Sequence, residues 1–173
     1  EEEYSLFIDY TAKPNERTVG GSSAITQDKG LYFINPLNKD PEKPQQIWTQ
    51  VETESNSAWF PTIDKPNERC TQEIKVTVQD RFETLSNGVL KSRTQNDNGT
   101  RTDYYVMEKP HAPYLFMLAI GEFAVVREEW NGIPLEYFVE KEYEPYAKDI
   151  YMHTPEMLTF FSEKLGVTYP WPK

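Results

Sequence analysis

The amino-acid sequence predicts a mainly β chain of the α+β class, in which a long antiparallel β section precedes a hairpin and one or two helices. Three observations support this prediction. Alternating apolar and polar residues recur through the first three quarters of the 173 residues. Asn-Gly pairs separate neighbouring strand-like segments. Apolar residues take up helical spacing only beyond about residue 144.

Five segments organise the first part of the chain. Leu6–Tyr10 alternates apolar and polar residues, which predicts a strand. Gly20-Gly21-Ser22-Ser23 predicts a loop, and Leu31–Ile34 predicts a short strand. Residues 36–45 hold three prolines and four charged residues, which predicts an exposed loop. Extended structure resumes at Ile47–Val51.

The middle of the chain predicts further strands and two hairpins. Ile74, Val76 and Val78 alternate with polar residues, as in a strand with one wet face. Asn98-Gly99 and Asn131-Gly132 each lie between two strand-like segments, and Asn-Gly readily takes positive φ at both turn positions. Asn87-Gly88 predicts a tight corner between strands. Tyr114–Ile120 is nearly all apolar, which predicts a strand buried on both faces.

Helical composition begins at Glu144-Pro145. Thr154-Pro155 predicts a helix cap followed by proline at the first helical position, and Gly166 can end that helix. Pro155 should divide a helix that runs from about residue 146 to 165. We expect residues 1–125 to form one β domain and residues 126–173 to begin a second. The expected apolar helix face consists of Met157, Leu158, Phe160, Phe161 and Leu165.

Composition limits the classes of partner. The 28 acidic and 18 basic residues give a net charge of −10. This charge disfavours nucleic acid and anionic membranes as partners, and no apolar run is long enough to span a bilayer. The chain begins with three glutamates rather than Met and stops at Lys173, just after two prolines and two aromatic residues. We therefore expect it to be a piece of a longer protein.

Few residues could carry chemistry. A zinc site needs three or four ligands, but the chain has only His111, His153 and Cys70 to offer beside its carboxylates. No His-Glu-x-x-His run, phosphate loop or Gly-x-Ser-x-Gly elbow is present. We interpret His111 as a structural or surface histidine and Cys70 as a small buried residue. The spacing of the residues does not exclude a nucleophile–base pair that uses Cys70. We expect no catalytic residue and no metal site in this chain.

The segment from Trp48 to Pro66 is unusual because it combines carboxylates, a glutamine, three aromatic residues and two spaced prolines. One interpretation is a stiff surface loop with Trp59 and Phe60 in the core. The other is a recognition loop with a carboxylate that faces a cation.

This segment resembles the zinc aminopeptidases of the aminopeptidase N type, which are relatives of the leukotriene hydrolases. Their Thr-Gln-Phe-Glu segment corresponds to Thr49-Gln50-Val51-Glu52. Departures from the family pattern fall at Asn56-Ser57, Thr62 and Lys65. The other matching positions are Phe60, Pro61, Asp64, Pro66, Arg69, Cys70, Ile74, Val76, Leu85-Ser86-Asn87, Tyr114-Leu115, Ala119-Ile120-Gly121-Glu122-Phe123 and Tyr169-Pro170-Trp171-Pro172-Lys173.

The resemblance implies a fold and a role. The chain would span most of a saddle-like N-terminal β domain, without its first strands, and the start of a thermolysin-like catalytic domain. Zinc is implied for the longer enzyme, and its ligands would lie beyond Lys173. Glu52 would bind the α-amino group of a peptide substrate, and Gln50 would line the pocket for its first side chain. The rest of the catalytic domain would be a partner of this chain.

Two other functions remain open from the sequence alone. A stand-alone β-sandwich binding module, for carbohydrate for example, is suggested by the 24 aromatic residues. A scaffold from a family member that has lost its zinc site is also compatible, because the diagnostic residues would lie downstream.

Overall fold

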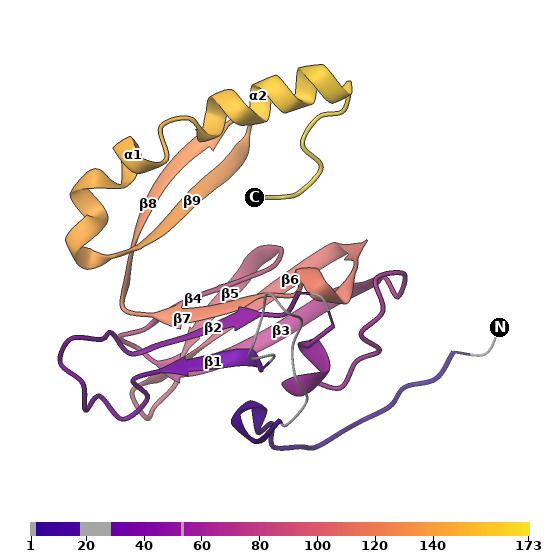
Figure 1. Cartoon of the computed structure of the whole chain (residues 1–173), viewed down its shortest axis with the longest axis vertical. Helices are drawn as coiled ribbons and strands as arrows, with labels where there is room; N and C mark the ends of the chain where they lie inside the picture. Colours follow the sequence, from indigo (N-terminus) through magenta and orange to yellow (C-terminus); the bar gives the residue numbers. More distant parts are fainter. Residues whose placement is uncertain (1–2, 18–28, 53) are drawn as a thin grey trace.

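The computed structural model describes residues 3–17, 29–52 and 54–173, and its strands form three antiparallel sheets (Figure 1). The first sheet has the order β1 (Gly30–Ile34), β2 (Gln46–Gln50), β7 (Leu118–Gly121) and β4 (Glu83–Ser86). The second has the order β3 (Cys70–Gln79), β6 (Thr100–His111) and β5 (Val89–Gln95). The third pairs β8 (Phe123–Trp130) with β9 (Ile133–Glu140). This architecture confirms the mainly β class and the two helices at the end.

The first two sheets pack face to face. Val76 comes from β3, whereas Leu118 and Ile120 come from β7, and these three buried residues form one cluster. Alternation along β3 places Val76 and Ile74 toward this core, while Lys75 and Thr77 face solvent, as the sequence predicts. The partly buried residues that pack against the cluster are Ile47, Trp59, Ile74, Val78 and Phe82.

Both predicted hairpins form, with different turns. In the β8–β9 hairpin, Asn131 and Gly132 have φ values of 51° and 78°, so both turn residues are left-handed as predicted. In the β5–β6 hairpin only Gly99, at φ 74°, is left-handed. The Asn98 side chain accepts a hydrogen bond from the Thr100 backbone N–H at 3.2 Å instead, which makes a wider turn.

The corner at Asn87-Gly88 carries the chain from one sheet to the other, because β4 belongs to the first sheet and β5 to the second. Gly88 has φ 76°, and a Cβ there would lie 2.0 Å from the carbonyl oxygen of Val106. This corner therefore requires glycine both for its backbone conformation and for close packing against β6.

Three predictions in the first 120 residues need correction or comment. Leu6–Tyr10 is extended but forms no strand, because no described segment pairs with it; Figure 1 shows it running along the outside of the molecule. Tyr114–Ile120 is not one buried strand, since Pro113 opens the 3-10 helix η3 (Pro113–Leu115) and the strand begins at Leu118. The loop predicted at residues 20–23 lies outside the described residues.

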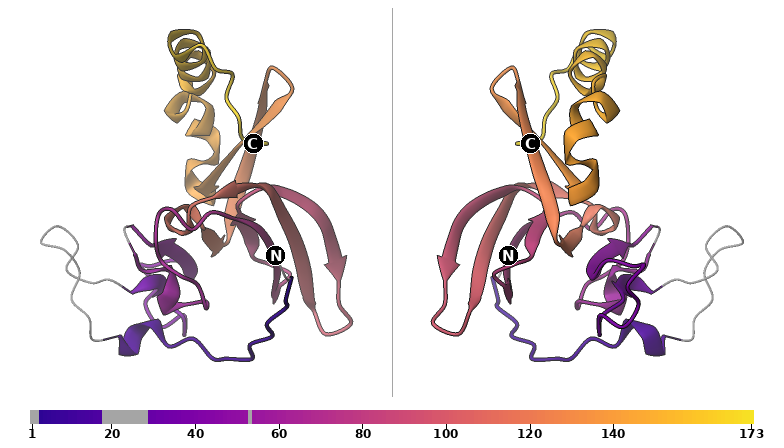
Figure 2. Two further views of the ribbon diagram at one scale, coloured as in Figure 1. Left: turned by 90° about the vertical axis from the view of Figure 1, so that its right-hand side faces the viewer. Right: turned by 90° about the vertical axis from the view of Figure 1, so that its left-hand side faces the viewer.

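The C-terminal part joins the β8–β9 hairpin to a helical segment (Figure 2). The short η4 (Lys141–Tyr146) and α1 (Ala147–Ile150) precede α2 (Thr154–Leu165), so the predicted division near Pro155 is confirmed. The cap of α2 is His153 rather than Thr154, and Pro155 is the second helical residue. The Thr154 hydroxyl contacts Tyr137 instead of capping the helix. Gly166, at φ 66°, ends α2 as predicted.

A second core holds this part together. Trp130, Leu135 and Tyr137 from the hairpin are buried, and Leu158 of α2 and Tyr169 pack on them. The other 3-10 helices, η1 (Pro14–Glu16) and η2 (Asn56–Ala58), belong to the first part of the chain.

After α2 the chain returns to the β sheets, as the yellow segment of Figure 1 shows. Three contacts fix it there. Lys109 Nζ donates to the Pro170 carbonyl, the Trp171 ring lies against the His111 ring, and Lys173 Nζ donates to the Ser86 carbonyl at 2.7 Å. We call residues 169–173 the C-terminal strap.

Candidate functional site

Gln50 and Glu52 lie together on the wall of an open hollow of about 310 Å³. Gln50 is the last residue of β2, and both side chains are exposed. Val51 between them is buried, so the alternation of an extended chain directs its two neighbours away from the core. The opposite wall is the segment Tyr114–Met117. The hollow is lined by Thr49, Gln50, Val51, Glu52, Tyr114, Leu115, Phe116 and Met117.

The hollow opens where the pairing of two strands ends. The ladder between β2 and β7 runs from Gln46–Gly121 to Trp48–Ala119 and goes no further. At the next position the Thr49 hydroxyl accepts a hydrogen bond from the Leu118 backbone N–H at 3.1 Å. Beyond this bond the two segments are unpaired, and the space between them is the hollow.

The loop after Glu52 is anchored by a buried amide. Asn56 is completely buried; its Oδ1 accepts a hydrogen bond from Trp59 Nε1 at 2.6 Å, and its Nδ2 donates to the Pro113 carbonyl. This second bond joins the loop to Pro113, the first residue of η3 and the residue just before the opposite wall. Asn56 replaces an alanine of the family pattern, so the departure noted in the sequence has a structural role.

Polar contacts close the rest of this loop. Asp64 Oδ2 accepts a hydrogen bond from the Ser57 N–H at 2.7 Å, and Lys65 pairs with Glu54 at 2.9 Å. Trp59 and Phe60 are partly buried and pack edge to face, with ring centroids 4.6 Å apart. Trp59 and Phe60 thus pack toward the core, as the first interpretation of the sequence predicts, while the Glu52 side chain is exposed.

Sequence reasoning missed the opposite wall. Tyr114 and Leu115 were assigned to a strand buried on both faces, but they are 40% and 42% exposed. Phe116 is buried between the Phe60 ring, 5.4 Å away, and the His111 ring, 4.4 Å away. The proline of Pro113 was the available signal, because proline favours the first turn of a helix over the interior of a sheet.

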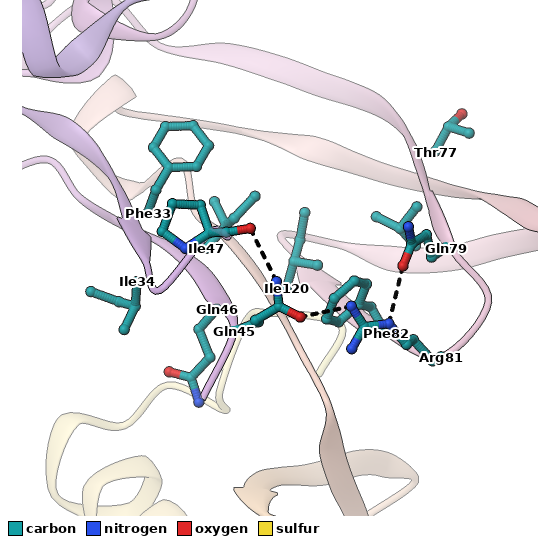
Figure 3. Close-up of a pocket in the computed structure, with 12 residues that line it drawn as sticks. Phe33, Ile34, Gln45, Gln46, Ile47, Thr77, Gln79, Arg81, Phe82 and Ile120 are labelled. Atoms are coloured by element: carbon teal, nitrogen blue, oxygen red, sulfur yellow. Dashed lines mark hydrogen bonds between the residues drawn. The ribbon is translucent and has the colours of Figure 1, made fainter. Parts of the chain in front are cut away.

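A separate hollow of about 350 Å³ lies between the two sheets (Figure 3). Its polar groups are already paired with one another. Arg81 Nε donates to Gln79 Oε1 at 3.0 Å, Arg81 Nη2 donates to Gln45 Oε1 at 2.7 Å, and Gln45 Nε2 donates to the Pro36 carbonyl at 3.1 Å. Neither Gln50 nor Glu52 lines this hollow. Because its polar rim is satisfied internally, it is a less suitable place for recognising a charged group.

Cys70 of β3 lies opposite His111 of β6 in the strand register, but the buried His111 Nε2 has no hydrogen-bond partner among the described residues, so the two do not form a nucleophile–base pair. His111 is buried, its Nδ1 lies 3.1 Å from the Lys109 carbonyl oxygen, and burial lowers its pKa, which favours the neutral ring. His111 is therefore an interior residue. His153 pairs with Glu156 on the surface. Cys70 was predicted to be buried but is exposed, because it begins β3 at the edge of its sheet.

Across residues 3–17, 29–52 and 54–173, no three His, Cys, Asp or Glu side chains are grouped so that they could hold a metal ion. Among the helices of the described chain, none has both the length and the apolar character needed to cross a bilayer.

Comparisons with known proteins identify the family of this chain. Residues 1–115 match the peptidase M1 N-terminal domain. Aminopeptidase B of Rattus norvegicus is 27% identical over 143 residues, covering 71% of this chain and 21% of the relative. Glutamyl aminopeptidase of the same species is 27% identical over 174 residues, covering 98% of this chain and 17% of the relative.

Not every relative bears an aminopeptidase name. Transcription initiation factor TFIID subunit 2 of Drosophila melanogaster is 24% identical over 147 residues, covering 82% of this chain and 12% of that protein. The chain thus spans about a fifth of the length of these relatives or less. With two thirds of its residues matched to one domain family, the chain belongs to the peptidase M1 N-terminal domain family.

Proposed function

We propose that this chain is part of a zinc-dependent aminopeptidase that removes N-terminal residues from peptides, and that Glu52 binds the α-amino group of the substrate. Gln50 would lie beside the first side chain of that substrate. The observation that carries the proposal is the shared hollow: the two residues matched to the family motif line one open space that a peptide end could enter.

The composition of the hollow suits a terminal ammonium group. Among the described residues that line it, Glu52 is the one that carries a charge, and its side chain is exposed to solvent. An ionised carboxylate forms charge-assisted hydrogen bonds with an ammonium group, and these are stronger than neutral ones. Fixing the terminus also fixes which peptide bond reaches the reactive centre, as an exopeptidase requires.

The described residues do not fit a zinc site, so its ligands would belong to the part of the longer protein outside this chain. The rest of the catalytic domain is the proposed partner, and α2 supports this. Its residues Met157, Phe160, Phe161 and Leu165 are between 49% and 72% exposed, which forms an apolar face suited to burial against further structure.

The same proposal includes a domain boundary between residues 125 and 126. The third sheet begins at Phe123, and its hairpin packs on α2 rather than within the two-sheet core. The boundary therefore falls close to the start of β8.

The test is Glu52→Gln in the full-length protein, with kcat/KM measured on aminoacyl substrates. Loss of a charge-assisted hydrogen bond costs about 1.5–3 kcal/mol, which is roughly tenfold to over a hundredfold. Glu54→Gln is the matched control, because Glu54 lies two residues further on, pairs with Lys65 and does not line the hollow. A Glu52→Gln enzyme within about twofold of wild type would contradict the proposal.

A second candidate is a non-catalytic scaffold. The similarity to TFIID subunit 2 supports it, because the name of that relative refers to transcription. Reading the coding sequence beyond Lys173 separates the two candidates. A His-Glu-x-x-His motif, with stoichiometric zinc in the purified protein, would favour the aminopeptidase. A continued fold without that motif would favour the scaffold.

A further inference from the structure

One side chain from a distant part of the sequence bonds the wall opposite Glu52 at two points. Asn87 Nδ2 donates to the Leu115 carbonyl at 2.8 Å, and Asn87 Oδ1 accepts from the Met117 N–H at 2.7 Å. Asn87 lies immediately after β4, about thirty residues earlier in the chain. Its amide thus satisfies backbone groups on both sides of Phe116, which makes it a clamp on the wall.

The wall needs this clamp because it belongs to no ladder. Pairing of β7 with β4 begins only at Leu118, so the Leu115 carbonyl and the Met117 N–H lie outside the sheet. The bond to the Met117 N–H is partly buried, where an unpaired backbone group is costly, whereas the bond to the Leu115 carbonyl is exposed. A side-chain amide supplies both the donor and the acceptor. Without Asn87, the wall would lose the two bonds that flank Phe116.

Further contacts support the clamp from the same side. Ser86 Oγ donates to the Met117 carbonyl at 2.8 Å, and the Ser86 carbonyl accepts from Lys173 Nζ at 2.7 Å. A third hollow, of about 280 Å³, lies between the Ser86–Asn87 corner and the C-terminal strap. Leu115 and Met117 line both hollows, so the wall is a thin partition with the strap behind it.

The chemistry of the wall indicates what it would contact. Leu115 and Met117 present apolar side chains, and the residues lining the Glu52 hollow include no lysine or arginine. An apolar side chain would gain contact area there, whereas an acidic one would meet Glu52 without a counter-charge.

We propose that the wall Tyr114–Met117 contacts the first side chain of a peptide held at Glu52, that it favours apolar first residues such as leucine, and that Asn87 is the positioning residue for this wall. This inference rests on the proposed function. Asn87 acts through the backbone of Leu115 and Met117 and does not itself line the Glu52 hollow.

The test compares leucyl and alanyl substrates in the full-length enzyme, because alanine is too short to fill the hollow as leucine does. We expect Asn87→Ala to lower kcat/KM for the leucyl substrate about tenfold and to leave the alanyl value within about twofold. A general loss of folded enzyme would lower both values equally. Asn98→Ala is the matched control, since Asn98 also precedes a glycine at a turn but lies in the distant β5–β6 hairpin.

Leu115→Ala is the second variant, in case Asn87→Ala does not fold. Leu115 is 42% exposed, so its truncation should be tolerated, and the leucyl-to-alanyl ratio should again fall. Glu52→Gln separates the two proposals. If it lowers both substrates while neither wall variant changes the ratio, the inference about the wall is wrong and the proposed function stands. If Glu52→Gln changes neither substrate, the proposed function is wrong as well.

Discussion

The indole nitrogen of Trp59 donates a 2.6 Å hydrogen bond to the amide oxygen of Asn56, which is completely buried. The same amide donates to the Pro113 carbonyl. Asn56 thereby connects the loop that follows Glu52 with the turn that precedes the opposite wall. Both sides of the candidate site depend on one neutral polar side chain in the interior.

We predict that Asn56→Ala destabilises the chain. The substitution leaves the Pro113 carbonyl and the Trp59 indole without this partner, and each unsatisfied buried group costs about 1–3 kcal/mol. Urea denaturation measures the change in the free energy of unfolding. Asn67→Ala is the control, because the exposed Asn67 side chain donates to the exposed Glu68 carboxylate, and this variant should stay within about 0.5 kcal/mol of wild type. Equal effects of the two substitutions would contradict the anchoring role of Asn56.

The two left-handed glycines at strand corners should respond differently to alanine. A Cβ at Gly88 would meet the Val106 carbonyl oxygen at 2.0 Å, whereas a Cβ at Gly99 would meet no atom within 4 Å. Both residues have similar φ values, 76° and 74°. Gly99→Ala should therefore cost about 1–2 kcal/mol for the left-handed backbone alone.

Gly88→Ala adds a backbone clash and should cost more than about 4 kcal/mol, which places it among the exceptional substitutions. Thermal unfolding followed by circular dichroism compares the two variants directly. If both midpoints shift by the same amount, the close approach of Gly88 to β6 does not add to the cost of the substitution.

Local signals allowed prediction of the parts of the fold that local physics determines. The Asn131-Gly132 turn, the alternation of Ile74, Val76 and Val78, and the end of α2 at Gly166 all depend on neighbouring residues, and all three were predicted correctly. Leu6–Tyr10 shows the limit, because alternation predicts an extended chain but a strand also requires a partner edge.

The candidate site could be predicted only in part. The motif around Glu52 was recognisable because its residues are contiguous in the sequence. The wall Tyr114–Met117 was not, because its shape depends on Asn87 and on Asn56, which lie about thirty and sixty residues away. Contacts of this kind leave no periodic trace in the sequence.

A buried ion cluster joins the two sheets at another place. Asp103 of β6 is completely buried and accepts hydrogen bonds from Arg93 Nε at 2.9 Å and from Thr84 Oγ1 at 2.6 Å. Arg101 is also buried and lies 3.3 Å from the same carboxylate. Burial alone would raise the pKa of Asp103, but the hydrogen bonds from Thr84, Arg93 and Arg101 lower it below its ordinary value.

We predict that Asp103→Asn costs about 3–5 kcal/mol near neutral pH, because it removes the buried carboxylate that pairs with Arg101 and leaves only the more exposed carboxylates of Asp80 and Glu83, at 3.5 and 3.4 Å. A carboxyl with a lowered folded-state pKa stabilises the fold above its unfolded pKa and loses that effect as the pH falls through the folded value. The gap between wild type and Asp103→Asn should therefore narrow below about pH 3.8. Glu108→Ala is the control, because Glu108 forms an exposed pair with Lys91 at 3.5 Å and should change stability by less than about 1 kcal/mol. A gap that is constant across this pH range would show that the charge of Asp103 is unimportant.

Lys173 provides a pH dependence of the same sign at alkaline pH. Its ammonium group donates to the Ser86 carbonyl and lies 5.0 Å from the centre of the Tyr105 ring. Burial lowers the pKa of Lys173 from 10.5 to about 8, although Glu136 opposes this shift. Between these two values the unfolded chain binds more protons than the folded chain, so this group makes the fold more stable as the pH rises.

The free energy of unfolding of wild type, relative to Lys173→Met, should therefore be constant below about pH 8 and increase above it. The full increase, reached near the unfolded pKa, is up to about 3 kcal/mol, since one pKa unit corresponds to about 1.4 kcal/mol. Methionine preserves much of the apolar stem but cannot titrate, so the ionisation of tyrosines largely cancels in the difference. Urea denaturation at intervals from pH 7 to pH 10 gives this difference curve. If the free energies of unfolding of wild type and Lys173→Met change in parallel with pH, the strap does not bury the Lys173 amine. The wall opposite Glu52 would then be supported by Ser86 and Asn87 without Lys173.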